Sequence, residues 1–377
     1  MKKTLLLLSL ACLLCGKTSA QTNDSPYAAF SFGLLTPLST NGARAGEYTN
    51  GASVNLLAGN SRNEEHLVVS GLCSIISERA TGLQVAGIST YIGREGRGVA
   101  LSGVANITRE SYKGVQLSGV MNRSGAHSRG VLIGGLYNRT KDHFSGLQFS
   151  GMCNIADDLD GIQLAGLLNT AGELSGVQFS GLLNIAKDIK GLQFAGLVNV
   201  AEEVQGVQFA VLVNVAEESD FPIGLINIIA KGEKGIALTY DMLGNAVVSF
   251  RSGGKYTYGI LGVGYNHKAN GNEITTEAGY GIHIPVCKWF ELNNEFKATT
   301  IGASSSLPAL NVGYLFAPSF RLGKHYNLFG GVSLNYMTAQ GKDHIGLFPE
   351  NRLWIGHTEK RLQQIYIGYQ AGLQFIF

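Results

Sequence analysis

Residues 176–186 read GVQFSGLLNIA, and close copies of this segment fill the middle of the chain. The second, fourth, eighth and tenth residues of the segment are apolar, and most of the residues between them are small or polar. Alternation with a period of two predicts a β-strand along the whole segment. Leu182 falls on the otherwise polar face, and the alternation does not account for it.

The copies recur at a spacing of sixteen residues that tightens to fifteen. They begin at Gly82, Gly98, Gly114, Gly130, Gly146, Gly161, Gly176, Gly191 and Gly206. The connectors at 187–190 and 202–205 are short and polar, which is typical of turns. We therefore predict an all-β protein in which residues 66–230 form surface-type repeats with one strand per repeat.

Two architectures fit these repeats. In the first, the strands run up and down as the wall of an antiparallel outer-membrane β-barrel, because such strands cross the apolar layer in about 9–11 residues. The apolar residues would face lipid and the amides would line the lumen. We expect these lumen-lining residues to be Gln148, Gln163, Gln178, Gln193, Gln208, Asn154, Asn169, Asn184, Asn199 and Asn214.

In the second architecture, each repeat is one turn of a parallel β-solenoid with stacked Asn residues and five-residue sides. The period favours it, because an up-and-down barrel should repeat every two strands. The outer surface argues against it, because Leu168, Val198 and Val200 would face outwards, and a water-soluble solenoid should not expose such residues repeatedly. We favour the barrel and keep the solenoid, followed by a smaller barrel, as the alternative.

The carboxy-terminal region, 231–377, predicts further barrel strands in longer alternating segments. Tight connectors at 252–254, 285–287 and 322–324 alternate with longer ones, as short periplasmic turns alternate with external loops. The chain ends at Phe377 in a strand that contains GLQF at 372–375, and the same four residues open the repeat at 191–194. This identity favours a barrel for the whole chain.

The last strand resembles the carboxy-terminal strand of bacterial outer-membrane barrels. In that class the terminal aromatic residue serves as a signal for the insertion machinery, so the resemblance implies that this machinery recognises Phe377. The GLQF and GLVNVA repeats, with segments such as 279–285 (GYGIHIP), resemble surface-repeat proteins of leptospires and other Gram-negative bacteria. This second resemblance covers about 66–377 and implies an exported surface protein without an assigned activity.

The amino terminus indicates export. Lys2 and Lys3 precede an apolar stretch at 5–14, and Thr18, Ser19 and Ala20 place small residues at a cleavage position. We predict a cleaved signal peptide at 1–20, N-terminal strands at 21–65 and an outer-membrane location with lipid as a partner.

Composition and motifs point away from catalysis. The net charge of +2 without a basic run gives no indication of nucleic-acid binding. Cys73, Cys153 and Cys287 are far apart and odd in number, which predicts neither a disulfide framework nor a metal site. None of the common hydrolase, metalloprotease or nucleotide-binding motifs is present. We expect no catalytic residue, no metal and no cofactor, and hence no enzyme.

The segment 338–363 is the longest predicted external loop. It contains Phe348, Arg352 and Trp354, a mixture that is common in recognition loops, and we expect it to form an external contact surface for a ligand that the sequence does not identify. The leading functional hypothesis is a non-catalytic barrel that passes small solutes or has a structural or surface role. The alternative is a surface-exposed solenoid for adhesion, anchored by a carboxy-terminal barrel.

Overall fold

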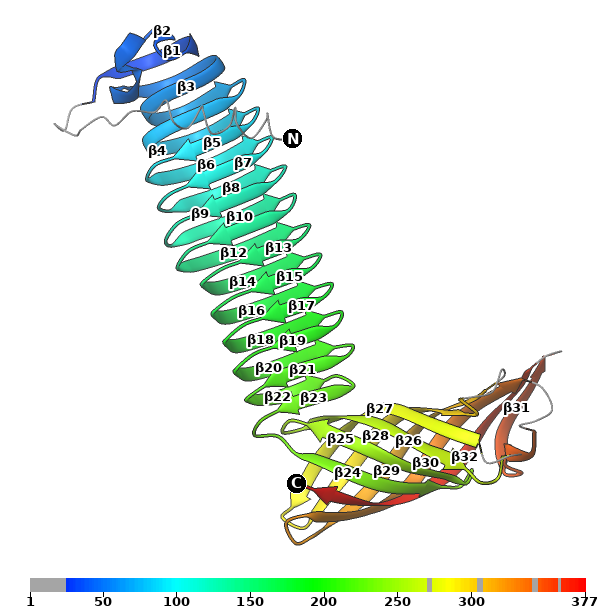
Figure 1. Ribbon diagram of the computed structural model, residues 1–377. Coiled ribbons are helices and arrows are strands. Elements are labelled where there is room, and N and C mark those ends of the chain that lie inside the picture. The colour runs from blue at the N-terminus through cyan, green and yellow to red at the C-terminus, as the bar shows by residue number, and fades with distance from the viewer. Residues whose placement is uncertain (1–24, 270–272, 304–307, 341–344, 359–360) are drawn as a thin grey trace.

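The chain forms two all-β units in series, a parallel solenoid and a closed antiparallel barrel (Figure 1). A computed structural model describes residues 25–269, 273–303, 308–340, 345–358 and 361–377. The predicted signal peptide at 1–20 lies outside these residues. The all-β prediction is confirmed, and of the two architectures the chain adopts the solenoid followed by a smaller barrel.

The solenoid has about 11 turns. Each residue pairs in parallel with its equivalent in the next turn, so that Gly176 lies opposite Gly191 and Asn184 opposite Asn199. The strands are β1 (Tyr27–Leu35), β2 (Leu38–Ser39), β3 (Thr49–Ser70), β4 (Cys73–Ala86), β5 (Ser89–Ile92), β6 (Glu95–Ser102), β7 (Ala105–Thr108), β8 (Tyr112–Ser118), β9 (Met121–Ser124), β10 (Ser128–Gly134), β11 (Tyr137–Thr140), β12 (His143–Ser150), β13 (Cys153–Ile155), β14 (Asp158–Ala165), β15 (Leu168–Thr170), β16 (Glu173–Ser180), β17 (Leu183–Ile185), β18 (Asp188–Ala195), β19 (Val198–Val200), β20 (Glu203–Ala210), β21 (Val213–Ala216), β22 (Glu218–Ile223) and β23 (Ile226–Ile229).

The expectation that the repeats are antiparallel wall strands of a barrel, one strand to a repeat, is wrong. Each repeat carries two strands, one long and one short, and closes one turn of the solenoid. The physical reason lies in the spacing of the repeats. Parallel stacking puts every repeat in the same environment, so the sequence repeats once per turn, whereas an up-and-down barrel would repeat every two strands. The GLQF sequence therefore occurs in a parallel solenoid strand at 191–194 and in an antiparallel barrel strand at 372–375.

Two glycines of each repeat make this stacking possible. Gly176 has φ = 142°, a conformation that residues with a side chain rarely adopt, and a Cβ there would lie 2.0 Å from the carbonyl oxygen of Gly161. A Cβ at Gly181 would lie 2.2 Å from the carbonyl oxygen of Gly166. Both glycines therefore mark positions where the chain changes direction and the turns approach closely. They divide a repeat into three five-residue segments, 176–180, 181–185 and 186–190.

The solenoid has an unusual distribution of polarity. Gln178, Ser180 and Asn184 point inwards and are buried, together with Ala186 and Ile189 of the third segment. An apolar cluster runs along the interior from Leu132, at a Gln position of the first segment, through third-segment residues to Ile229. Leu182, which strand alternation could not explain, lies at the bend between β16 and β17 and is exposed.

The solenoid is closed at its amino-terminal end by a small cap. Strand β1 pairs in parallel with β3, β2 folds back onto β1, and the 3-10 helix η1 (Gly42–Glu47) precedes β3. Strand β1 therefore covers the first half of β3, and β2 covers the end of β1.

The barrel has eight strands and is closed by pairing of β24 with β32. A ninth strand, β31, extends the sheet beside β32, and the 3-10 helix η2 (Ile345–Leu347) precedes it. The strands are β24 (Lys234–Asp241), β25 (Asn245–Gly253), β26 (Thr257–Asn266), β27 (Glu273–Cys287), β28 (Phe290–Ile301), β29 (Ala309–Leu322), β30 (Tyr326–Gln340), β31 (Arg352–Thr358) and β32 (Arg361–Ile376).

The solenoid joins the barrel at the end that carries the carboxy terminus and runs crosswise to the barrel axis (Figure 1). Its last turn rests on the β25–β26 hairpin. Asn227 donates to the Ser252 hydroxyl and carbonyl oxygens at 2.9 and 3.1 Å, and the Thr257 hydroxyl donates to the Pro222 carbonyl at 2.7 Å. The barrel hairpin therefore caps the last turn of the solenoid.

Candidate functional site: the barrel lumen and the solenoid surface

The amides expected to line a barrel lumen lie inside the solenoid instead. Gln148 to Gln208 stack in one row, which we call the Gln ladder, and each amide donates to the previous one at 2.8–3.1 Å. Asn106 to Asn227 form a second row, the Asn ladder, with spacings of 2.9–3.0 Å. All ten predicted amides have no exposed surface. None of them is available to a solute.

The Asn ladder also ties the interior to the backbone. The Asn184 amide donates to the Asn199 side chain at 3.0 Å and to the Phe194 carbonyl at 2.7 Å, and it accepts from Asn169 at 3.0 Å. A buried amide with these partners avoids the cost of an unsatisfied polar group. The role of both ladders is structural.

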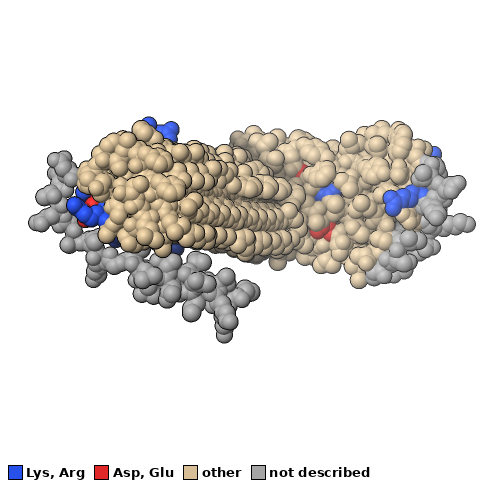
Figure 2. All heavy atoms as spheres, turned by 90° about the horizontal axis from the view of Figure 1, so that it is seen from above, with Lys and Arg blue, Asp and Glu red and all other residues tan. Residues whose placement is uncertain are grey.

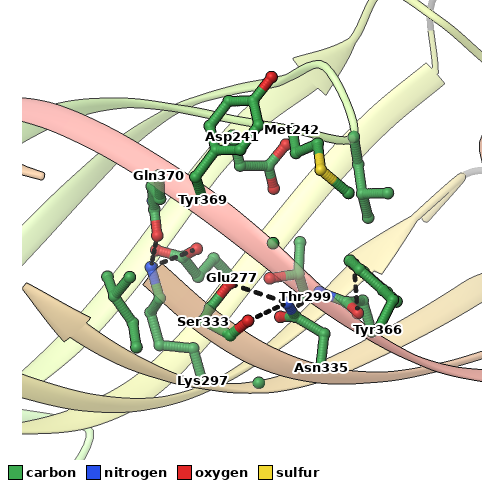
Figure 3. Close-up of a pocket in the computed structure, with 15 residues that line it drawn as sticks. Asp241, Met242, Glu277, Lys297, Thr299, Ser333, Asn335, Tyr366, Tyr369 and Gln370 are labelled. Carbon is green, nitrogen blue, oxygen red and sulfur yellow. Dashed lines mark hydrogen bonds and ion pairs between the residues drawn. The ribbon is translucent and has the colours of Figure 1, made fainter. Parts of the chain in front are cut away.

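The barrel lumen contains a network of charged side chains. Glu295 accepts from Arg251 at 2.6 and 3.3 Å and from the Tyr258 hydroxyl at 2.8 Å. Lys297 lies 3.4 Å from Glu295 and 3.3 Å from Glu277. Figure 3 shows Lys297 between Glu277 and Gln370, and its amine also donates to the Gln370 amide oxygen. These side chains come from β25, β26, β27, β28 and β32, so the register of the closed barrel brings them together.

The network and its neighbours fill the lumen. Cavities of about 30 and 20 Å³ lie among the described residues of the lumen, each with room for about one or two waters. Towards the long loops, a buried apolar cluster that includes Leu243, Ile301, Met337 and Leu347 follows, with Phe348 packed against it. An eight-stranded barrel is just wide enough for side chains to fill, and here they do.

The predicted external contact residues divide between two environments. Phe348 is partly buried against the apolar cluster at the loop end of the barrel. Arg352 begins β31, and Trp354 in the same strand is 47% exposed. The structure therefore brings Arg352 and Trp354 together on a strand beside β32, while Phe348 belongs to the closure of the lumen.

The outer surface of the solenoid is apolar on two segments of each repeat and charged on the third. Outward residues of the first two segments include Phe149, Phe179, Leu182 and Leu197, each between 41% and 53% exposed. The third segments form a shallow groove of about 530 Å³, lined by His143, Asp158, Asp160, Glu173, Asp188, Lys190 and Glu203 among others. This segregation gives the solenoid two apolar flanks and one charged side.

Several other kinds of site are absent from the part of the chain that the structure describes. No group of three or more His, Cys, Asp and Glu side chains could hold a metal ion there. No helix among those residues is both long and apolar enough to cross a membrane. Comparison with protein-family profiles, curated proteins and solved structures finds no match for this chain.

Sequence reasoning missed the lumen network, although a signal for it was present. Arg251, Glu277, Glu295 and Lys297 are charged residues at inward positions of the strand alternation. Charged residues at such positions have to find partners across a closed sheet. What the sequence could not provide was the pairing, since Arg251 and Glu295 are 44 residues apart.

Proposed function

We propose that this protein is a non-catalytic outer-membrane protein whose carboxy-terminal barrel anchors the solenoid at the periplasmic face of the membrane. The observation that carries the proposal is the polarity of the closed barrel. Its outward strand residues are apolar, as at Leu238, Val263 and Ile282, which are between 50% and 59% exposed, and the charged residues Arg251, Glu277, Glu295 and Lys297 are buried inside. A barrel in water would need the opposite arrangement, whereas lipid favours this one.

Aromatic residues at both ends of the barrel support a membrane placement. Trp289, Phe290 and Phe320 cluster at the end with the short turns, with ring centroids 5.2–6.2 Å apart. Tyr240 and Tyr265 lie near the other end and are about half exposed. Aromatic girdles of this kind are typical of the two interfaces of a membrane barrel.

The orientation follows from the connectors. The solenoid leaves the barrel at the end with the tight turns and the carboxy terminus, and in bacterial outer-membrane barrels this is the periplasmic end (Figure 1). Phe377 at this end fits the recognition signal for the insertion machinery. The predicted signal peptide and the resemblance to leptospiral-type surface-repeat proteins are consistent with export, while the connectors favour a periplasmic solenoid over a surface adhesin.

A channel is the less favoured function, because the ionic network fills the lumen. We expect an anchoring and structural role, with no conducted solute. Purified protein in planar lipid bilayers should give no stable conductance, and the membrane-extracted protein should migrate differently in SDS gels before and after boiling. Recovery in the soluble fraction would contradict the membrane placement, and stable conductance would contradict the closed lumen.

Orientation is tested by cysteine labelling in intact cells, in a variant in which Cys73, Cys153 and Cys287 are replaced by Ser. Leu353→Cys, at a position 63% exposed in β31, should react with a membrane-impermeant maleimide in intact cells. Lys187→Cys, on the charged side of the solenoid, should react only after the outer membrane is permeabilised. The reverse pattern would indicate a surface-exposed solenoid.

A further inference from the structure

The two apolar flanks of the solenoid form one continuous surface. In the repeats that begin at Gly82 to Gly206, the outward residues of the first two segments are almost all apolar, and the charged exceptions are Arg123 and Arg139. With turns about 4.8 Å apart, nine repeats make a surface roughly 40 Å long. Soluble monomers rarely expose an apolar patch of more than a few hundred Å², so something other than water should cover this one.

We infer that this surface is covered by lipid, and that the solenoid lies along the periplasmic leaflet of the membrane that holds the barrel. The inference rests on the proposed membrane anchoring of the barrel. It adds a second membrane contact, made by the solenoid itself, to the contact made by the barrel wall.

The position of the solenoid supports this occupant. It runs crosswise to the barrel axis, so it extends alongside a membrane that the barrel spans rather than away from it (Figure 1). Figure 2, seen from above, shows the part of the solenoid surface between its amino-terminal cap and the barrel, and the middle of the solenoid is uncharged in this view. An uncharged part of the solenoid surface therefore lies on the side towards which the barrel extends.

The apolar surface is also continuous with the barrel. The row of outward residues that includes Leu192 and Val207 ends at Phe221, whose ring stacks on Tyr256 of the barrel rim with centroids 5.0 Å apart. Tyr256 lies in the β25–β26 turn, at the interfacial end of the wall. An apolar ring contact therefore links this row of the solenoid flank to the barrel rim, and the Lys255 amine lies over the same Tyr256 ring, 5.1 Å from its centroid.

The shape of the surface favours lipid over a second copy of the chain. The flanks meet at the row of Leu167, Leu182 and Leu197, which lies at a bend and is 39–44% exposed. A second rod could cover one flat flank but would leave the other in water, whereas acyl chains adapt to both. Arg123 and Arg139 stack on adjacent turns, and their long side chains can reach lipid phosphates from an apolar surface.

The test uses the full-length protein without native cysteines, reconstituted at less than one copy per vesicle. The vesicles contain phosphatidylethanolamine and phosphatidylglycerol, with or without brominated acyl chains. An environment-sensitive dye is attached at Leu182→Cys or Leu197→Cys on the flank, at Lys187→Cys on the charged side, or at Val263→Cys on the barrel wall. Leu182 and Leu197 are exposed, so these substitutions leave the interior intact.

Lipid contact predicts that brominated chains quench the dyes at 182, 197 and 263, while iodide in solution quenches only the dye at 187. Quenching at 263 by lipid with quenching at 182 and 197 by iodide would overturn the lipid inference alone. Absence of lipid quenching at 263 would overturn the proposed anchoring as well. Protection of 182 and 197 from both quenchers, together with cross-linked dimers at higher protein density, would assign the surface to a second copy and also overturn the inference.

Discussion

The solenoid and the barrel both bury polar side chains and expose apolar ones, but they satisfy the buried polar groups in different ways. The solenoid stacks identical neutral amides, such as Asn184 on Asn199, because an amide is both donor and acceptor and can bond to a copy of itself. The barrel pairs unlike charges, such as Arg251 with Glu295. A buried charge cannot be repeated every turn, since like charges would stack about 4.8 Å apart in the interior without water to screen them. A structure that repeats the same buried position in every turn therefore favours neutral amides there. A closed sheet without such a repeat can pair buried side chains of opposite charge.

The largest loss of stability is expected when a charge replaces one of the stacked neutral amides of the solenoid. Asn184→Asp keeps the shape of the side chain but removes both donations, to Phe194 and Asn199, and places a carboxylate against an amide oxygen. We expect a loss of about 4 kcal/mol in the free energy of unfolding, since an uncompensated charge is buried. Circular dichroism during urea unfolding in detergent measures it. Asp160→Asn on the exposed charged side is the control and should change little; equal losses for the two variants would contradict the role of the ladder.

Removing a buried charge should destabilise the barrel, whereas adding one should destabilise the solenoid. Glu295→Gln leaves Arg251 buried without its carboxylate, while Lys297 keeps Glu277 at 3.3 Å. We expect a loss of about 3 kcal/mol. The measurement is the temperature at which the folded band disappears in SDS gels. Glu350→Gln, at an exposed loop position, should leave that temperature unchanged; a matching drop in this control would remove the network as the cause.

The junction tests whether the two units are coupled. The Ser252 hydroxyl accepts from the backbone N–H of Asn227 at 2.9 Å, so Ser252→Ala leaves a buried donor at the last rung of the Asn ladder. We expect a loss of about 1–2 kcal/mol in the last solenoid turns. Hydrogen exchange should rise around Asn227 while the gel-shift temperature of the barrel stays the same. Ser175→Ala on the exposed side is the control, and unchanged exchange at Asn227 would mean that the cap is dispensable.

The sequence predicted the all-β class, the repeats and the carboxy-terminal barrel, but it did not decide between the two architectures for the repeats. Alternation at Val177, Phe179, Leu183 and Ile185 fits a membrane strand and an inside-out solenoid equally well, because both put apolar residues outside. The barrel was favoured for the repeats because a solenoid was assumed to have a polar outer surface. Two of the three outer segments of this solenoid are apolar instead. The period of one repeat was the better guide.

The candidate sites were less predictable for a related reason. Gln178 and Asn184 were correctly assigned to a polar face, but whether that face encloses water or other amides depends on which strands are neighbours. Phe348 was assigned to an external surface because it lies in a long loop, and it packs instead against the apolar cluster at the barrel end. In both cases the residue type was informative, and the missing information was long-range pairing.

Glu64 provides the smallest test, because it is a carboxyl inside the solenoid. It avoids the stacking problem, since Ala80 is its equivalent in the next turn. Burial raises the pKa of Glu64 above its ordinary value of 4.5, and hydrogen bonds from Asn50 and Ser53, at 2.8–3.0 Å, oppose that rise. The folded chain therefore holds this proton more tightly than the unfolded chain.

The sign of the pH dependence follows from that raised pKa. The contribution of Glu64 to stability is fully present below about pH 4.5, the ordinary value, and is lost as the pH rises through the raised pKa. Glu64→Gln should remove this dependence, so the difference in unfolding midpoint between wild type and variant should shift in favour of the variant between pH 4 and pH 8. Other carboxyls cancel in the difference. A difference independent of pH would mean that Glu64 is as well solvated as an exposed glutamate. Glu64 would then no longer be an exception to the contrast between neutral polar groups buried in the solenoid and charged groups buried in the barrel.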